Sequence, residues 1–102
     1  MNVMNNIARQ GRLALLENDS ATGDPVVWGG GIGSFTAEGT FDGTTVYLEY
    51  ESPTGNWISA GSESELTAEG GFVFELHPCR IRAAVSGGSP SALYAWVQPT
   101  GG

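Results

Sequence analysis

The residues best suited to catalysis or metal binding are the single histidine, His77, and the single cysteine, Cys79. Placed two apart, they could share one strand face, as a Cys-His nucleophile or part of a zinc site requires. A zinc site takes about four ligands, and a nucleophile also needs an orienting group and an oxyanion hole. Because Pro78 separates the pair, we expect a turn between strands, with Cys79 as a small buried or half-buried hydrophobe.

Acidic side chains are the other candidates for catalysis or metal binding, since the chain has 11 Asp and Glu against four Arg and no Lys. Two carboxylates could act as the acid and base of a glycosidase, but a domain of this size rarely builds the necessary cleft beside a complete core. The polar loop at residues 18–24 offers oxygen ligands that calcium could use, yet it lacks the EF-hand order. We therefore expect no enzyme activity, no cofactor and no bound metal.

The charge balance limits the partners. A formal net charge of −7 repels phosphate backbones and anionic membranes. The sequence contains no run approaching the roughly 20 apolar residues of a membrane span, and its first ten residues contain no uninterrupted apolar segment of a secretory signal. We expect a soluble protein that binds neither nucleic acid nor membrane.

Aromatic rings are the remaining candidates for function, because rings exposed on a sheet can stack on sugars or anchor a protein interface. The set comprises Trp28, Tyr47, Trp57, Tyr94 and Trp96. Tyr47 alternates with Val46 and Leu48 and is therefore predicted to be exposed. Trp57 and Trp96 are predicted to belong to the core, because the chain has few other large side chains.

These candidates must be positioned by strands. Sixteen Gly and five Pro separate short runs rich in β-branched and aromatic residues, which indicates many short strands with tight turns. The predicted strands cover residues 13–17, 26–28, 34–41, 45–51, 57–58, 72–76, 80–86 and 92–98. The dipeptide Asp42-Gly43 predicts a type I′ hairpin between two of them, and the turn at residues 52–56 predicts a second hairpin.

Alternation within the strands assigns their faces. Glu49 and Glu51 point outward on one strand, and Arg80 and Arg82 point outward on another, so neighbouring strands would form cross-strand ion pairs. The last strand is apolar on both faces, which suits the centre of a sheet or a subunit interface.

The fold class that follows is all-β: a single antiparallel β-sandwich, either jelly-roll or Ig-like, over residues 12–102. Residues 1–11 are predicted to form an N-terminal arm. The arm is either extended or a short helix, because Val3, Met4 and Ile7 recur at helical spacing before Gly11.

Residues 39–61 and 65–97 resemble small β-sandwich virion structural proteins of tailed bacteriophages, of the capsid decoration or cement type. The resemblance lies in the Gly-x-Phe-x-Gly segment beginning at Gly39, the turn before Trp57, the Arg-x-Arg-x-x-Val-Ser-Gly strand and Leu93-Tyr94-Ala95. It implies a capsid-surface protein without catalysis that binds and stabilises the assembled phage head.

The resemblance also implies the partners: the major capsid protein or other virion proteins, and further copies of the chain, with a trimer as the expected form. The candidate interface residues are Met4, Ile7, Leu13, Tyr47, Tyr94 and Trp96. Met4 and Ile7 would be buried only on assembly. The alternative is a carbohydrate- or receptor-binding β-sandwich module of a fibre or tail, and a small accessory domain of an enzyme is a third possibility.

Overall fold

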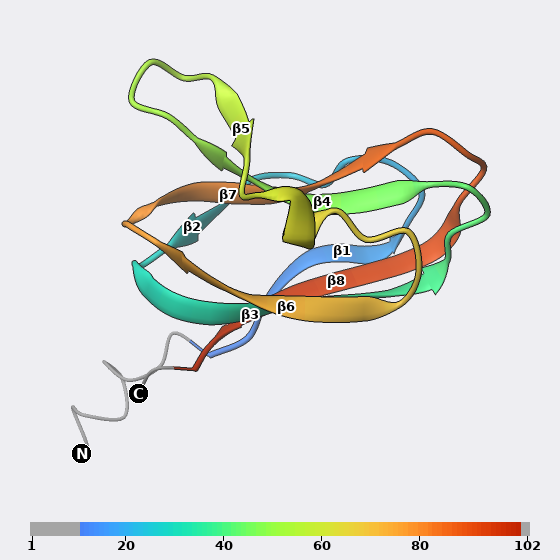
Figure 1. The fold of residues 1–102 in the computed structure, drawn as a ribbon, viewed down its shortest axis with the longest axis horizontal. Helices are drawn as coiled ribbons and strands as arrows, with labels where there is room; N and C mark the ends of the chain where they lie inside the picture. The colour runs from blue at the N-terminus through green and yellow to red at the C-terminus, as the bar shows by residue number, and fades with distance from the viewer. Residues whose placement is uncertain (1–10, 101–102) are drawn as a thin grey trace.

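Eight strands and one short 3-10 helix make up the described part of the chain, residues 11–100 of a computed structural model (Figure 1). The elements are β1 (Leu13–Asp19), β2 (Val26–Trp28), β3 (Gly31–Thr40), β4 (Thr45–Glu51), β5 (Trp57–Ser59), η1 (Ser62–Ser64), β6 (Gly70–Leu76), β7 (Cys79–Ser86) and β8 (Ser91–Pro99). The arm predicted over residues 1–11, with Met4 and Ile7, lies outside the described residues except for Gly11.

The strands form two antiparallel sheets of four strands each. Sheet A has the order β1-β8-β3-β6, and sheet B has the order β2-β7-β4-β5. Except for β4 and β5, consecutive strands alternate between the sheets, which gives the jelly-roll form of the sandwich. The predicted all-β sandwich is therefore confirmed, and the jelly roll is the one of the two expected architectures that the chain adopts.

The segment at Asp42-Gly43 makes the predicted turn but not the predicted hairpin. Asp42 and Gly43 have φ of 45° and 85°, and the N–H of Thr44 donates to the carbonyl of Phe41 at 2.9 Å, as a type I′ turn requires. However, β3 belongs to sheet A and β4 to sheet B, so the hairpin prediction was wrong. The turn reverses the chain, but both strands find their partners elsewhere and face each other across the core.

The second predicted hairpin is present. Glu51 of β4 lies opposite Trp57 of β5, and the N–H of Ser52 donates to the carbonyl of Asn56 at 2.8 Å across the turn. Here the two strands share sheet B, in which β5 is the edge strand and pairs with β4.

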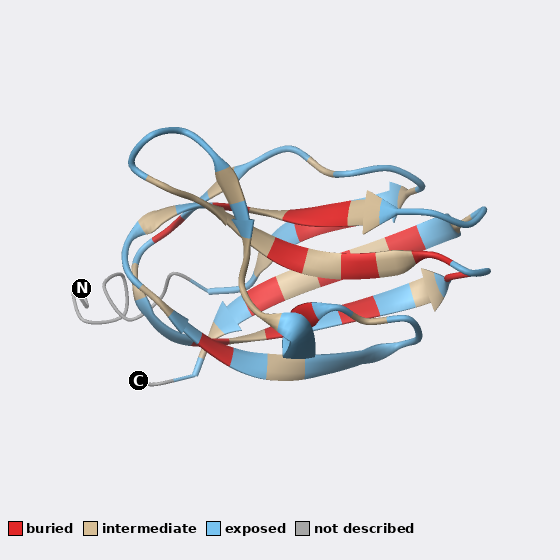
Figure 2. Ribbon diagram, turned by 45° about the horizontal axis from the view of Figure 1, so that its top comes forward, coloured by how far each residue is buried: buried red, intermediate tan, exposed pale blue. Residues whose placement is uncertain are grey.

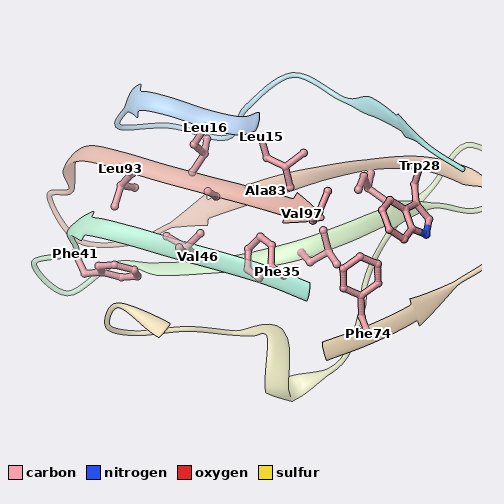
Figure 3. Packing of buried hydrophobic residues seen from close by; sticks show 14 residues of the cluster. Leu15, Leu16, Trp28, Phe35, Phe41, Val46, Phe74, Ala83, Leu93 and Val97 are labelled. Carbon is pink, nitrogen blue, oxygen red and sulfur yellow. The ribbon is translucent and has the colours of Figure 1, made fainter. Parts of the chain in front are cut away.

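The core fills the space between the two sheets. Figure 2 shows buried positions alternating with exposed ones along the strands, and Figure 3 shows side chains of both sheets meeting between the layers. Trp28 is fully buried at 0% exposure, with its ring 5.0 Å from that of Phe74. Gly33 makes room for this indole, because a Cβ there would lie 2.6 Å from Trp28 Cη2. Trp28 is thus a core residue and is not available as a surface ring.

Strand β8 occupies a central position in sheet A, between β1 and β3, as its two apolar faces predicted. Its inward residues Leu93, Ala95 and Val97 are fully buried. The outward face carries Tyr94 and Trp96, which are only half-buried. The described residues contain no helix long and apolar enough to cross a membrane.

Candidate interaction surface

His77 and Cys79 flank the turn between β6 and β7, as Pro78 predicted. They line an open hollow of about 420 Å³ together with Val27, Trp28, Glu51, Ser52, Pro53, Pro78 and Arg80. The His77 ring lies edge-on to Tyr50, with 5.8 Å between ring centres.

This hollow offers little for chemistry. Burial raises the pKa of the Cys79 thiol, which lowers the fraction of reactive thiolate. Within residues 11–100 there is no group of three or more His, Cys, Asp or Glu side chains that could hold a metal ion. The pair therefore shows neither the ligand set of a zinc site nor the activation that a cysteine nucleophile needs.

The outer face of sheet B carries two cross-strand ion pairs, as predicted. Arg82 Nε donates to Glu49 Oε1 at 2.8 Å, directly across the β4–β7 pairing. Arg80 binds Glu51 with two hydrogen bonds of 2.8 Å, from Nε to Oε1 and from Nη2 to Oε2. The hydrogen bond from Arg80 lowers the pKa of Glu51.

Trp57 lies on this outer face and not in the core, so its prediction as a core residue was wrong. The Cζ atoms of Arg82 and Arg80 lie 4.3 Å and 5.8 Å from the centre of its ring. The indole is half-buried because the two guanidinium groups cover it. The main charges and the aromatic ring of this face are therefore already engaged with one another.

Tyr47 and Leu13 take separate positions. Tyr47 lies on sheet B opposite Ala84 and is half-buried, so it is less exposed than predicted. Leu13 is half-buried and packs against the core. Neither residue lies beside Tyr94 and Trp96, so the described candidates do not form one continuous surface.

The outer face of sheet A carries the largest set of candidates. Tyr94 and Trp96 stack side by side on β8, with 5.9 Å between ring centres and 22° between ring planes. Trp96 was predicted in the core, and that was wrong because β8 turns its small and aliphatic residues inward. We call this surface the A face and define it by Ala14, Glu17, Ile32, Thr36, Glu38, Val73, Tyr94 and Trp96.

Exposed aliphatic side chains also lie on sheet A, on β3 and β6. Val73 and Ile32 are 66% and 42% exposed, which is high for aliphatic side chains. In the strand register, Trp96 lies between Ala14 and Thr36, and Tyr94 lies between Glu17 and Glu38. The A face therefore combines two aromatic rings, one of them flanked by glutamates, with exposed aliphatic side chains farther across the sheet.

Three residues around these rings were not identified from the sequence. Arg12 places its guanidinium carbon 5.9 Å from the centre of the Trp96 ring, and Glu17 and Glu38 flank Tyr94. Phe35 and Ala37 occupy alternate, inward positions of the strand, so the sequence could have placed Glu38 on the outward face. Its position beside Tyr94 depends on strand register, which the sequence does not state.

Comparisons with known proteins bear on the fold. No family model matches the chain, and no curated protein matches its sequence. Among solved structures, it is similar to the crystal structure of murine APRIL at pH 8.5, with a TM-score of 0.53 and 15% identity over 86% of this chain and 98% of that chain. At this identity the likeness shows the fold alone, and the class it supports is the jelly-roll domain.

A viral structure also matches, at a lower score. It is the structure of infectious bursal disease virus, Gx strain, with a TM-score of 0.35 and 12% identity over 89% of this chain and 32% of that chain. The present chain thus spans about a third of the viral chain.

Proposed function

We propose that this chain is a virion structural protein, a decoration or cement protein that binds the surface of an assembled phage head and stabilises it. The observation that carries the proposal is the A face. Tyr94 and Trp96 lie half-buried at the centre of a sheet, and Val73 is exposed two strands away on β6. Partly buried aromatic residues surrounded by polar residues are typical of the centre of a protein interface.

The contrast between the two sheets supports the choice of surface. On sheet B, Trp57 is covered by arginines and both arginines are paired with glutamates. Such a face has less to gain from a partner, because its arginines and glutamates already pair with one another. The A face keeps its glutamates free of ion pairs among the described residues, so a partner can still use them.

The partner in this proposal is the major capsid protein or another virion protein, and the role is binding without catalysis. The jelly roll serves in viral capsid proteins and in lectins, so the fold is compatible with this role and with the alternative below. The phage resemblance further suggests a homo-oligomer, with a trimer as the proposed form. Size-exclusion chromatography with light scattering measures that mass directly.

Cosedimentation with purified phage heads that lack this protein tests the function. We expect the wild-type chain to sediment with the heads, and Tyr94→Ala and Trp96→Ala to reduce the bound fraction strongly. Ile58→Ala is the control, since it removes an exposed apolar side chain from the opposite sheet. A stable monomer that stays in the supernatant with intact heads would contradict the proposal.

A second candidate function is carbohydrate or receptor binding. The specific observation in its favour is the pair of half-buried rings, Tyr94 and Trp96, on one outer sheet face, since aromatic side chains of this kind offer an apolar body and a polar group to a ligand. Trp57 is less suitable, because Arg82 occupies one side of its ring. Titration with a panel of oligosaccharides distinguishes the two functions: saturable binding that Tyr94→Ala abolishes would favour this function over head binding.

A further inference from the structure

We propose that Glu17, Tyr94 and Glu38 form a binding site for an arginine side chain presented by a basic protein partner. We call these three residues the Glu-Tyr-Glu row. The inference rests on the proposed function, because the partner is the surface on which the A face docks. The inference adds the chemical group, an arginine side chain, that the A face would recognise on that partner.

The row crosses three adjacent strands. Glu17 of β1 and Glu38 of β3 both lie directly opposite Tyr94 of β8, one on each side. Directly opposed side chains in antiparallel strands point to the same face and have Cβ atoms about 5 Å apart. Both glutamates are exposed and the tyrosine is half-buried. Trp96 stacks on one side of the Tyr94 ring, so a ligand would approach the ring from its remaining side, between the two carboxylates.

The charges of the row favour a cation. An aromatic face carries partial negative charge and attracts cations placed over it. Two carboxylates beside the ring add to that attraction, and within residues 11–100 neither forms an ion pair. A planar guanidinium suits the site better than an ammonium, because it can stack on the ring and donate two parallel hydrogen bonds to a carboxylate.

Sheet B shows, with a different strand register, how this chain holds a guanidinium between an aromatic ring and a carboxylate. There the guanidinium of Arg82 lies over Trp57 at 4.3 Å and donates to Glu49 at 2.8 Å. On sheet A the neighbouring ring, Trp96, is already approached by Arg12. The Glu-Tyr-Glu row has the ring and the carboxylates, and among the described residues it has no guanidinium.

The partner is a basic protein surface and not a second copy of the chain. A copy docked face to face would bring two pairs of these carboxylates together, in molecules that each carry a formal net charge of −7. Among the described arginines, Arg80 and Arg82 are committed to their own glutamates and Arg12 lies against Trp96. Charge complementarity therefore points to a protein that supplies arginine.

Titration of the full chain with a tetra-arginine peptide, acetylated and amidated at its ends and followed by amide shifts in NMR spectra at low salt, tests the site. We expect saturable shifts at Glu17, Glu38, Tyr94 and their strand neighbours. The double variant Glu17→Gln/Glu38→Gln should weaken binding about ten-fold, since it removes both charge-assisted hydrogen bonds. Tyr94→Leu should weaken it as well, and the equivalent tetra-lysine peptide should bind the wild type less tightly.

The control variant Glu63→Gln/Glu65→Gln removes two equal charges from the segment between β5 and β6. It should change the affinity by less than about two-fold if binding is local and not a response to net charge. Equal losses in the two double variants would overturn the inference, and so would shifts on the A face caused by a neutral oligosaccharide but not by the arginine peptide.

The cosedimentation experiment with phage heads distinguishes failure of the arginine site from failure of the proposed decoration function. Heads that bind wild type and Glu17→Gln/Glu38→Gln equally well would overturn the arginine site and leave the decoration function standing. Heads that bind neither protein, with peptide binding intact at the row, would overturn the decoration function and support the arginine site.

Discussion

The guanidinium of Arg82 lies 4.3 Å from the centre of the Trp57 ring. The same side chain donates to Glu49 at 2.8 Å, so one arginine on β7 connects β4 and β5. Strand β5 has only three residues and lies at the edge of sheet B. The Trp57 indole thus holds the short edge strand β5 against the outer face of sheet B. The sequence had predicted Trp57 to be a core residue.

Replacement of Arg82 by lysine should therefore destabilise the fold. Lysine keeps the charge but loses the planar stacking on Trp57, so we expect the loss of part of a cation–π contact worth about 0.5–1 kcal/mol at exposed sites. Urea unfolding at pH 7 measures the change in the free energy of unfolding. Arg80→Lys is the matched control and should have a smaller effect, because its side chain is 52% exposed against 27% for Arg82. Equal effects would contradict the role assigned to Arg82.

The ion pair of Glu51 with Arg80 should make stability depend on pH. The hydrogen bond from Arg80 lowers the pKa of Glu51 in the folded state. The pair therefore stabilises the fold above the ordinary glutamate pKa of about 4.3, and this contribution is lost as the pH falls through the lowered value. The stability difference between wild type and Glu51→Gln should be present at pH 7 and shrink towards pH 3. Unfolding curves in which the difference stays constant would contradict this linkage.

Addition of a methyl group at Gly33 should disturb the core. A Cβ there would lie 2.6 Å from Trp28 Cη2 and 2.9 Å from Phe74 Cζ, so at least one ring must shift. We expect Gly33→Ala to lower the free energy of unfolding by about 1–3 kcal/mol, as overpacking does. Gly70→Ala serves as the control in the same urea experiment, because its Cβ would have no neighbour closer than 3.9 Å.

The turns after β3 and β7 should depend on Gly88. Its φ is +65°, and a Cβ there would lie 2.5 Å from the carbonyl oxygen of Asp42. Gly88→Ala should cost about 2 kcal/mol or more, from backbone strain and from the clash. Gly55 has a φ of +92° with nothing within 4 Å of its Cβ position, so Gly55→Ala should show the strain alone. A melting temperature equally lowered by both changes would contradict the packing of the two turns.

The strands were predictable because their evidence is local. Val46 and Leu48 alternate with Tyr47, and the last strand has apolar residues on both faces, so position and orientation follow from a few neighbouring residues. The ion pairs of Glu49 and Glu51 also followed once two strands with outward charges were recognised.

Pairing and burial were less predictable because they depend on distant parts of the chain. Asp42-Gly43 specifies a turn but not whether its strands share a sheet. Trp28 lies in a strand of three residues, too short for alternation to show which way the ring points. The positions of Glu17 and Glu38 beside Tyr94 can be predicted only when the register of three separate strands is known.

The place of β8 in sheet A has a consequence for synthesis. Strand β1 has β8 as its neighbour, and β8 also separates it from β3. On the ribosome, β1 must therefore wait without its native partner until residues 91–99 emerge. Sheet A is therefore completed last, when β8 inserts between β1 and β3, which have already been synthesised. A polypeptide truncated before β8 would leave the edges of β1 and β3 unpaired and prone to aggregation.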